Sequence, residues 1–181
     1  MSRIGKQPIE IPQEARIEVD GNQILVSGPK GSQTFQLRSE VKVELEDGKL
    51  MVKRKNDSKM ARSLHGLTRT LISNMVVGVT RGWEKTLEVI GTGFTAKTEG
   101  EKLVLKLGFS HPVEFTPSEG ISFSTAENKI KVTGADKAKV GEVAARIRAA
   151  YPPNVYSGKG VRYSGEVVRK KPGKAAKAIG G

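Results

Sequence analysis

The amino-acid sequence predicts an α+β fold built from two similar domains. Runs that alternate apolar and polar residues, which is the period of a strand, precede each of two stretches with helical periodicity. The chain also resembles itself at a fixed offset, since Phe35 corresponds to Phe115, 80 residues later. Because the strands are grouped ahead of each helix, we expect antiparallel sheets. Each domain should therefore be a small, mostly antiparallel sheet with one main helix, produced by an internal duplication.

The first copy begins with strand-like runs and ends with a helical stretch. The expected strands cover residues 16–20, 23–27, 34–37, 41–45 and 49–54. Asp57 and Ser58 are candidate caps for the helix that follows. The apolar positions expected on the buried face of this helix recur at helical spacing at Met60, Leu64, Leu67 and Leu71.

The second copy repeats this order in the same register. Its expected strands cover residues 87–91, 102–107, 121–125 and 129–133. Asp136 is the candidate cap of its helix, and the expected buried positions are Val140, Val143, Ala144 and Ile147. The double proline at 152–153 ends this helix, and residues 161–168 are strand-like. We expect domains over residues 1–81 and 82–168, followed by a basic tail over residues 169–181.

The composition points to a polyanion as the partner. The 181 residues include 31 Lys and Arg against 19 Asp and Glu, a formal net charge of +12. Residues 153–181 alone hold 7 basic residues and 1 acidic residue, which is half of the excess. With no cysteine and 2 histidines, the chain lacks the ligands for a disulfide or a structural zinc site. No stretch approaches the roughly 20 apolar residues of a membrane span, so we expect a cytoplasmic protein without a membrane partner.

Two glycine-bearing segments resemble nucleotide-binding loops only superficially. Gly91, Gly93 and Ala96 have the spacing of a dinucleotide-binding loop, but strand-like residues follow where such a loop requires a helix. Residues 28–32 lack the spacing of a Walker loop and have the composition of a hairpin turn. Both segments are therefore expected to be turns.

Hydroxyl, imidazole and carboxylate groups form no recognisable catalytic set in the sequence. Ser110 is next to His111, but no third group is identified that would orient a base. His65 lies within the first helical pattern and is expected at the helix surface or the edge of the core. The acidic residues are scattered singly. We expect no catalytic residue, no metal, no cofactor and no small-molecule substrate.

The candidate functional segment is the basic, glycine-rich stretch after the double proline. Gly158 and Gly160 flank Lys159, so backbone amides and one ammonium group can approach a phosphate together. The rings of Tyr156 and Tyr163 can stack on an unpaired base or lie along a ribose. The full set of expected RNA-binding residues is Tyr156, Gly158, Lys159, Gly160, Arg162, Tyr163, Arg169, Lys170, Lys171, Lys174 and Lys177.

A frayed, solvated tail is the main alternative to an RNA-binding segment, because a basic C-terminal run often has no other role. Two features favour RNA binding: aromatic residues are interleaved with the charges, and the stretch begins with a strand-like run. An enzyme that acts on RNA or nucleotides is a further alternative, and it requires a pocket with convergent ionisable groups. A general binder of membranes or polyanions is another, although the tail has no amphipathic apolar face.

Six separated blocks of the sequence resemble, in the same order, the bacterial L6 (uL6) family of large-subunit ribosomal proteins. They are "SRIGKQPI", "GPKG", "SLHGLTRTL", "GFSHPV", "DKAKVGEVAARIR" and "YSGKGVRYSGE". In the last block, Tyr156, Gly158, Lys159 and Gly160 match the family pattern. The family usually has a lysine directly after the tyrosine, and Ser157 occupies that position here.

This resemblance implies two similar α+β domains that bind large-subunit (23S) rRNA, mainly through the C-terminal domain and tail. It implies a place near the sarcin-ricin loop and the stalk base, where translation factors dock, with neighbouring ribosomal proteins as partners. A member of this family would be a structural component of the ribosome in the cytoplasm, without catalysis or cofactor. Composition and spacing alone reach only a duplicated α+β protein with a basic, RNA-binding end.

Overall fold

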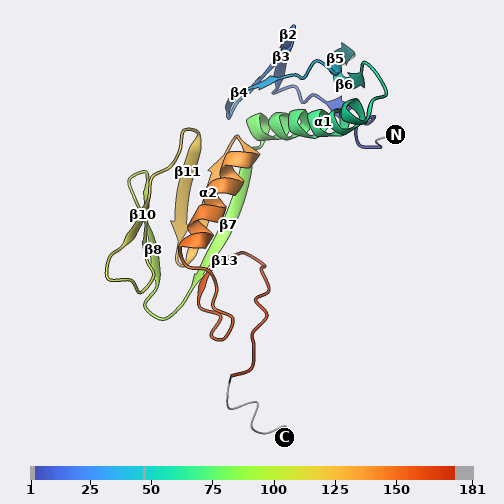
Figure 1. The fold of residues 1–181 in the computed structure, drawn as a ribbon. Coiled ribbons are helices and arrows are strands. Elements are labelled where there is room, and N and C mark those ends of the chain that lie inside the picture. Colours follow the sequence, from blue (N-terminus) through green and yellow to red (C-terminus); the bar gives the residue numbers. More distant parts are fainter. Residues whose placement is uncertain (1–2, 47, 174–181) are drawn as a thin grey trace, which may run out of the picture. The chain divides into compact units, whose positions relative to one another are not determined.

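The computed structural model describes residues 3–46 and 48–173, and the chain forms two compact units. The first unit contains the chain up to Trp83 together with Gly134–Lys137. The second contains Glu84–Thr133 and the chain from Ala138 onwards. Each unit combines small sheets with one long helix, as Figure 1 shows.

Two three-stranded sheets form the β part of the first unit. The strands are β1 (Ile9–Glu10), β2 (Arg16–Asp20), β3 (Gln23–Gly28), β4 (Gly31–Gln36), β5 (Val41–Glu46) and β6 (Lys49–Arg54). They assemble in the orders β2-β3-β4 and β1-β6-β5, and every neighbouring pair is antiparallel. Alternate residues face the core, as in a half-buried strand: Ile24 and Val26 of β3 and Leu50 of β6 are fully buried.

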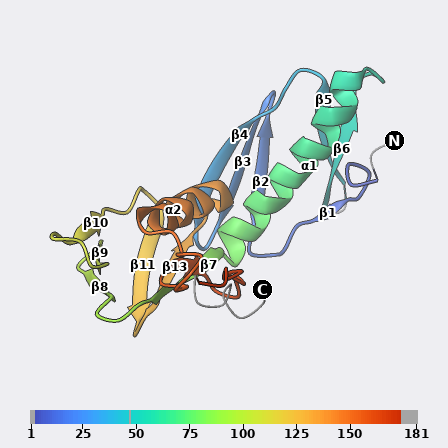
Figure 2. The ribbon, with the colours of Figure 1, turned by 60° about the horizontal axis from the view of Figure 1, so that its bottom comes forward.

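Helix α1 (Lys59–Thr80) lies against both sheets of the first unit (Figure 2). Ser58 is its N-cap, as the sequence predicts, because the Ser58 hydroxyl accepts a hydrogen bond from the Ala61 amide at 3.1 Å. The buried residues of α1 include Ala61, His65, Thr68, Ile72, Met75, Val76 and Val79. These residues form a stripe that continues to the end of the helix and covers the sheets.

The predicted buried face of α1 is wrong by one residue. Met60 and Leu67 are 62% and 52% exposed, whereas the residue after each of them is buried. A shift of one residue rotates a helix by about 100°, and both stripes fit helical periodicity. The apolar residues of the last turns, such as Met75 and Val79, set the rotation of the helix on the sheets. His65 is therefore deeply buried, and its Nε2 lies 2.8 Å from the carbonyl oxygen of Val52.

The second half of the chain repeats this architecture and adds one strand. Its elements are β7 (Trp83–Ile90), β8 (Thr95–Glu99), β9 (Lys102–Lys106), β10 (Val113–Phe115), β11 (Ile121–Ala126), β12 (Lys129–Gly134), α2 (Lys137–Ala150) and β13 (Gly160–Tyr163). The sheets have the orders β8-β9-β10 and β11-β12-β7-β13. Helix α2 begins directly after Asp136 and buries Val140, Val143, Ala144 and Ile147, as predicted.

The internal duplication is confirmed by the matching order of elements. Strands β11 and β12 begin and end 80 residues after β5 and β6. Helix α1 follows β6, and helix α2 follows β12. The order β8-β9-β10 repeats β2-β3-β4, and β11-β12-β7 repeats β5-β6-β1. Strand β13 has no counterpart among the described residues of the first copy. It is the structural addition that distinguishes the second copy.

Candidate nucleic-acid interface

Strand β13 attaches the basic C-terminal stretch to the sheet of the second unit. It pairs antiparallel with β7, and Figure 1 shows the two strands side by side. Val161 is fully buried between its neighbours, and its amide donates a hydrogen bond to the carbonyl oxygen of Tyr151 at 2.8 Å. The strand is shorter than the predicted run of residues 161–168, because Gly165 has a φ of +82° and Glu166 folds back to Tyr163 in a turn. The beginning of the stretch is therefore an integral part of the fold.

The loop between α2 and β13 is ordered by Asn154. The Asn154 Oδ1 accepts hydrogen bonds from the amides of Tyr156, at 2.8 Å, and Ser157, at 3.1 Å. The Asn154 amide donates to the carbonyl oxygen of Lys159 at 2.9 Å, and the Gly158 amide donates to the carbonyl oxygen of Asn154 at 2.8 Å. These four bonds close the loop on itself. Lys159 is thereby held at a fixed position on the surface.

Both glycines of the loop are required by the backbone. Gly158 has a φ of +74°, and a Cβ added there would lie 2.7 Å from Cε of Lys170. Gly160 has a φ of +142°, and a Cβ added there would lie 2.7 Å from Cα of Pro153. The first glycine lets a lysine side chain pass across the loop. The second lets β13 run against the double proline.

Four cations of the stretch are exposed and have no acidic partner within the part of the chain that the structure describes. They are Lys159, Arg169, Lys170 and Lys171. Lys159 Nζ lies 3.4 Å from the hydroxyl oxygen of Thr92, and the Lys171 amide donates to the carbonyl oxygen of Val155 at 2.8 Å. The chain after β13 thus returns to the loop and brings its cations beside Lys159. Lys174 and Lys177, also expected to bind RNA, lie outside the described residues.

Arg162 differs from these cations because it has an internal carboxylate. Its Nε and one terminal nitrogen lie 3.2 Å and 3.1 Å from Oε2 of Glu88 on β7, and the Ser164 hydroxyl donates to the other Glu88 oxygen at 3.1 Å. The hydrogen bonds from Arg162 and then from Ser164 lower the pKa of the Glu88 carboxyl below its usual range. Arg162 thereby ties β13 to β7 through side chains as well as through the backbone.

A second ion pair fixes the turn after β13. Arg148 of α2 donates to both oxygens of Glu166, and Oε2 of Glu166 also accepts the Tyr163 amide at 3.0 Å. These bonds lower the pKa of the Glu166 carboxyl, with Arg148 as the main cause, and raise the pKa of Arg148. The helix, the turn and the strand are therefore held together at one point.

The two tyrosines of the stretch have different surroundings. Tyr156 is 61% exposed at the tip of the loop. The Tyr163 ring is half-buried and has two cationic neighbours, with Lys85 Nζ 6.0 Å and the Arg148 guanidinium 5.7 Å from its centroid. The ring of Tyr156 is open to a ligand, and that of Tyr163 already has cationic neighbours.

Sequence reasoning missed the supporting residues of this site. No pattern marks Asn154, Glu88, Arg148 and Thr92 as parts of it: Glu88 and Thr92 are distant in the chain, and Arg148 belongs to the preceding helix. Asn154 offers a signal in retrospect, since asparagine is typical of turns in which the side chain bonds the backbone two residues later, as it does here with Tyr156.

The remaining sequence candidates form no catalytic site. The segment of Gly91 and Gly93 is a turn, in which the Phe94 amide donates to the Gly91 carbonyl oxygen at 3.3 Å, and β8 follows it in place of a helix. Ser110 and His111 lie in a bend before β10. Among the described residues, no cluster of His, Asp and Glu has the arrangement of a metal site, and no helix is both long and apolar enough to cross a membrane.

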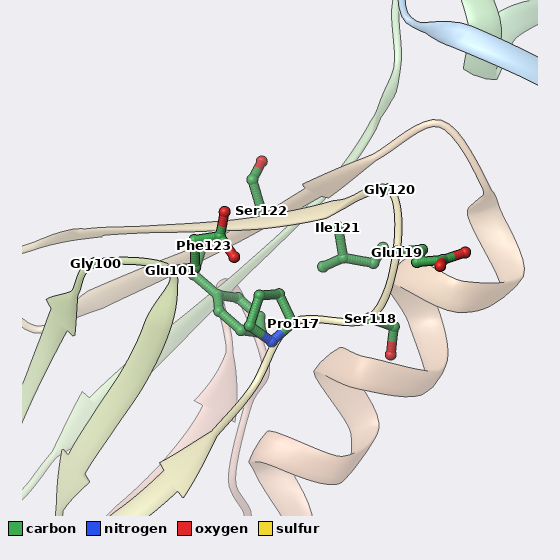
Figure 3. Close-up of a pocket in the computed structure, with 9 residues that line it drawn as sticks. All are labelled: Gly100, Glu101, Pro117, Ser118, Glu119, Gly120, Ile121, Ser122 and Phe123. Atoms are coloured by element: carbon green, nitrogen blue, oxygen red, sulfur yellow. The ribbon is translucent and has the colours of Figure 1, made fainter.

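An open hollow of about 420 Å³ lies in the second unit, away from the basic stretch (Figure 3). It is lined by Gly100, Glu101, Pro117, Ser118, Glu119, Gly120, Ile121, Ser122 and Phe123. In Figure 3 the carboxylate of Glu119 does not point toward that of Glu101. The hollow has no basic residue in its lining and shares no residue with the loop or with β13. It therefore offers neither paired catalytic carboxylates nor an anion site.

Comparison with known proteins assigns the chain to a family. Residues 11–82 and 90–164 match the model of ribosomal protein L6, one segment in each copy of the duplication. The large ribosomal subunit protein uL6 of Herpetosiphon aurantiacus is 52% identical over 178 residues, covering 98% of this chain and 99% of that protein. The uL6 proteins of Staphylococcus carnosus and Pelotomaculum thermopropionicum are 51% and 49% identical over 178 and 176 residues, covering 98% and 97% of this chain and 100% and 97% of theirs. The chain is therefore a member of the ribosomal protein L6 family.

Proposed function

We propose that this protein is a structural component of the large ribosomal subunit that binds large-subunit (23S) rRNA mainly through its second unit and C-terminal tail. Relatives that match nearly the full chain are named as large ribosomal subunit proteins, and the family is not enzymatic. The observation that carries the RNA-binding part is a set of exposed cations: Lys159 on a loop that Asn154 orders, and Arg169 to Lys171 in the segment after β13 that returns to this loop. The protein works in the cytoplasm as part of the ribosome.

The mechanism is electrostatic docking on a surface whose shape is set before RNA arrives. Lys159 is a phosphate ligand, because the Asn154 hydrogen bonds fix its backbone and its ammonium group reaches the surface beside Thr92. Lys170 crosses Gly158 and adds a second charge at the same place. A-form RNA hides its base edges in a deep groove and exposes phosphates and 2′-hydroxyls, so this surface recognises shape more than sequence. A loop that is ordered beforehand loses little conformational entropy on binding.

The paired residues of the stretch have a positioning role in this proposal. Arg162 neutralises Glu88 and ties β13 to β7, so its guanidinium is only partly available to phosphate. Tyr163 lies next to Arg162 in β13 and has Lys85 and Arg148 as cationic neighbours. Tyr156 is the exposed ring that can pack on a ribose or a base. Lys174 and Lys177, which lie outside the described residues, extend the charge of the tail.

We place the bound protein near the sarcin-ricin loop and the stalk base, with neighbouring ribosomal proteins as further partners. Support for this location comes from the six sequence blocks shared with the L6 family. In functional terms, residues 1–81 form an N-terminal repeat, residues 82–168 an RNA-binding repeat and residues 169–181 a basic tail. The C-terminal end is assigned to RNA because residues 153–181 carry half of the net positive charge of the chain.

Deletion of residues 169–181 tests the proposal. The truncated protein should keep its fold, bind large-subunit rRNA more weakly and show a flatter dependence of log K on log salt, because each lost phosphate contact removes roughly 0.9 from the slope by the duplex-DNA rule. Anionic vesicles serve as the control ligand, and the full chain should prefer rRNA to them. An unchanged salt slope would contradict the proposed contact surface.

A further inference from the structure

An aromatic cluster borders the loop between α2 and β13, which we name the cationic loop because it carries Lys159. The cluster has no role in the electrostatic docking described above. It is made by Phe94, Phe109 and Tyr151, with His111 stacked on the outside. The ring centroids of Phe94 and Tyr151 are 5.2 Å apart, those of Phe109 and Tyr151 are 5.6 Å apart, and both pairs meet edge to face. The cluster thus joins the turn after β7, the bend before β10 and the end of α2.

The outer members of this cluster are open to solvent. The Phe109 side chain is 47% exposed and His111 is also exposed, whereas Phe94 and Tyr151 are half-buried beneath them. The rings of Phe109 and His111 are nearly parallel, with an interplanar angle of 18° and centroids 6.2 Å apart. We name these two residues the exposed aromatic pair.

The exposed aromatic pair is held in place from both ends of its bend. Leu107, at the start, is 1% exposed, and Gly108 has a φ of +81° in a position where a Cβ would lie 3.2 Å from Cε1 of Phe94. Beyond the pair, Val113 of β10 pairs with Leu105 of β9. Phe109 also packs on the Tyr151 ring. The pair is thus a fixed surface feature, so little conformational entropy is lost when a ligand packs on it.

Two contacts connect this cluster to the cationic loop. Tyr151, which supports Phe109, accepts the amide of Val161 in β13 through its carbonyl oxygen. Thr92, in the same turn as Phe94, lies 3.4 Å from Nζ of Lys159. The aromatic cluster and the phosphate-binding lysine are therefore connected through Tyr151 and through the turn of Thr92 and Phe94. A phosphate ligand next to an aromatic face is the arrangement by which proteins hold unpaired nucleotides.

We propose that Phe109, together with His111, is a stacking site for an unpaired base of the RNA whose backbone phosphates contact Lys159. The inference rests on the proposed function and adds to it the class of RNA element that is bound: a loop or bulge in place of a continuous duplex. Bases in an A-form helix are stacked on their neighbours, so only an unpaired base can present its face to a side chain. The stacking contact adds affinity but does not change the salt dependence of binding, because stacking releases no counterions.

The test compares variants of Phe109 in the full-length protein, with large-subunit rRNA as the probe. Phe109→Ala and Phe109→Leu should each weaken binding roughly five- to hundredfold with an unchanged salt slope, whereas Phe109→Trp should retain affinity. The leucine variant keeps apolar bulk on Tyr151 but has no π face, so its loss of affinity separates stacking from packing. Leu67→Ala, at a side chain of similar exposure in the first unit, is the matched control and should bind normally.

Thermal unfolding of each variant reports whether the fold is intact. Full rRNA affinity in a folded Phe109→Ala protein would overturn the stacking site, and so would normal binding by Phe109→Leu. The deletion of residues 169–181 distinguishes this failure from that of the proposed function: if the deletion weakens binding while both Phe109 variants bind normally, only the stacking site is refuted. Ultraviolet crosslinking of assembled large subunits should also attach a nucleotide to the peptide that contains Phe109, and recovery of this peptide only in unmodified form would overturn the inference.

Discussion

The two copies of the duplicated domain differ most at one edge of one sheet. In the first copy, the order β5-β6-β1 ends at a strand of two residues, Ile9–Glu10. In the second, the equivalent strand β7 has eight residues and pairs on its far side with β13. A sheet edge carries unpaired backbone groups that can accept another strand, and the second copy uses this edge to anchor the basic C-terminal stretch. The two copies therefore share a scaffold, and the second has an additional strand and loop at one edge of its sheet.

The first copy and the C-terminal stretch also differ in their balance of basic and acidic residues. Residues 1–81 carry 14 basic and 9 acidic residues, whereas residues 153–181 carry 7 and 1 in about a third of the length. Several cations of the first copy are neutralised locally, such as Lys53 by Glu44 and Arg54 by Asp57. Neutralised charges contribute little to binding a polyanion, because an ion pair must be broken before a phosphate contact forms. Unpaired positive charge thus accumulates in the segments just before and after the added strand.

The largest effect should come from breaking the attachment of β13. Val161→Asp puts a carboxylate at a fully buried position against β7, and burial of an unpaired charge should cost more than about 4 kcal/mol. Hydrogen exchange should show lost protection in β7 and β13, while β3 in the first unit stays protected. The affinity of the Val161→Asp variant for large-subunit rRNA should fall as well. Val167→Asp, at a side chain 87% exposed in the same stretch, is the matched control, and equal effects of the two changes would contradict the role of β13.

Local patterns predicted the repeated elements but could not predict how they pack. Strands β6 and β12 and helix α2 follow from period-two and helical spacing, because each pattern is contained in a few consecutive residues. The rotation of α1 depends on which stripe meets the sheets, and two stripes one residue apart fit its first turns equally well. The two-residue β1 is too short to produce an alternating pattern.

The candidate site was predictable in its cations and not in its supports. The Gly-Lys-Gly pattern predicts Lys159 and its flanking glycines, and the structure adds that Asn154 bonds to the backbone of Lys159 and Gly158. Arg162 and Glu88 are 74 residues apart in the chain, so only the register of β13 on β7 brings them together. Phe109 and Tyr151 meet for the same reason, through tertiary packing. Residue type predicts which side chains can bind RNA, whereas the fold decides which of them are already paired.

A smaller effect should distinguish the unpaired cations of the second copy from the paired ones. Lys159→Gln removes one phosphate contact, so the salt slope should fall by about 0.9, equivalent to roughly eightfold weaker binding at 0.1 M salt by the duplex-DNA rule. Lys102→Gln is the matched control, because Lys102 on β9 lies 3.6 Å from Glu114 on the neighbouring β10, in a sheet that does not contain β13. It should leave both the slope and the affinity unchanged. Equal slopes for the two variants would show that the loop does not contact phosphate.

The smallest expected effect concerns the ion pairs that hold β13, and it depends on pH. The folded-state pKa of Glu88 lies below its ordinary value, mainly because of Arg162, so this carboxylate contributes stability above an ordinary glutamate pKa of about 4.3. That contribution is lost as the pH falls through the lower, folded-state pKa. Glu88→Gln should therefore reduce the stability of the second unit near neutral pH and flatten its decline in acid, measured by denaturant unfolding at a series of pH values. Glu99→Gln, an exposed carboxylate without an ion pair among the described residues, should leave the acid decline intact. Parallel pH profiles for the wild type and Glu88→Gln would show that the Arg162 pair does not stabilise the added strand.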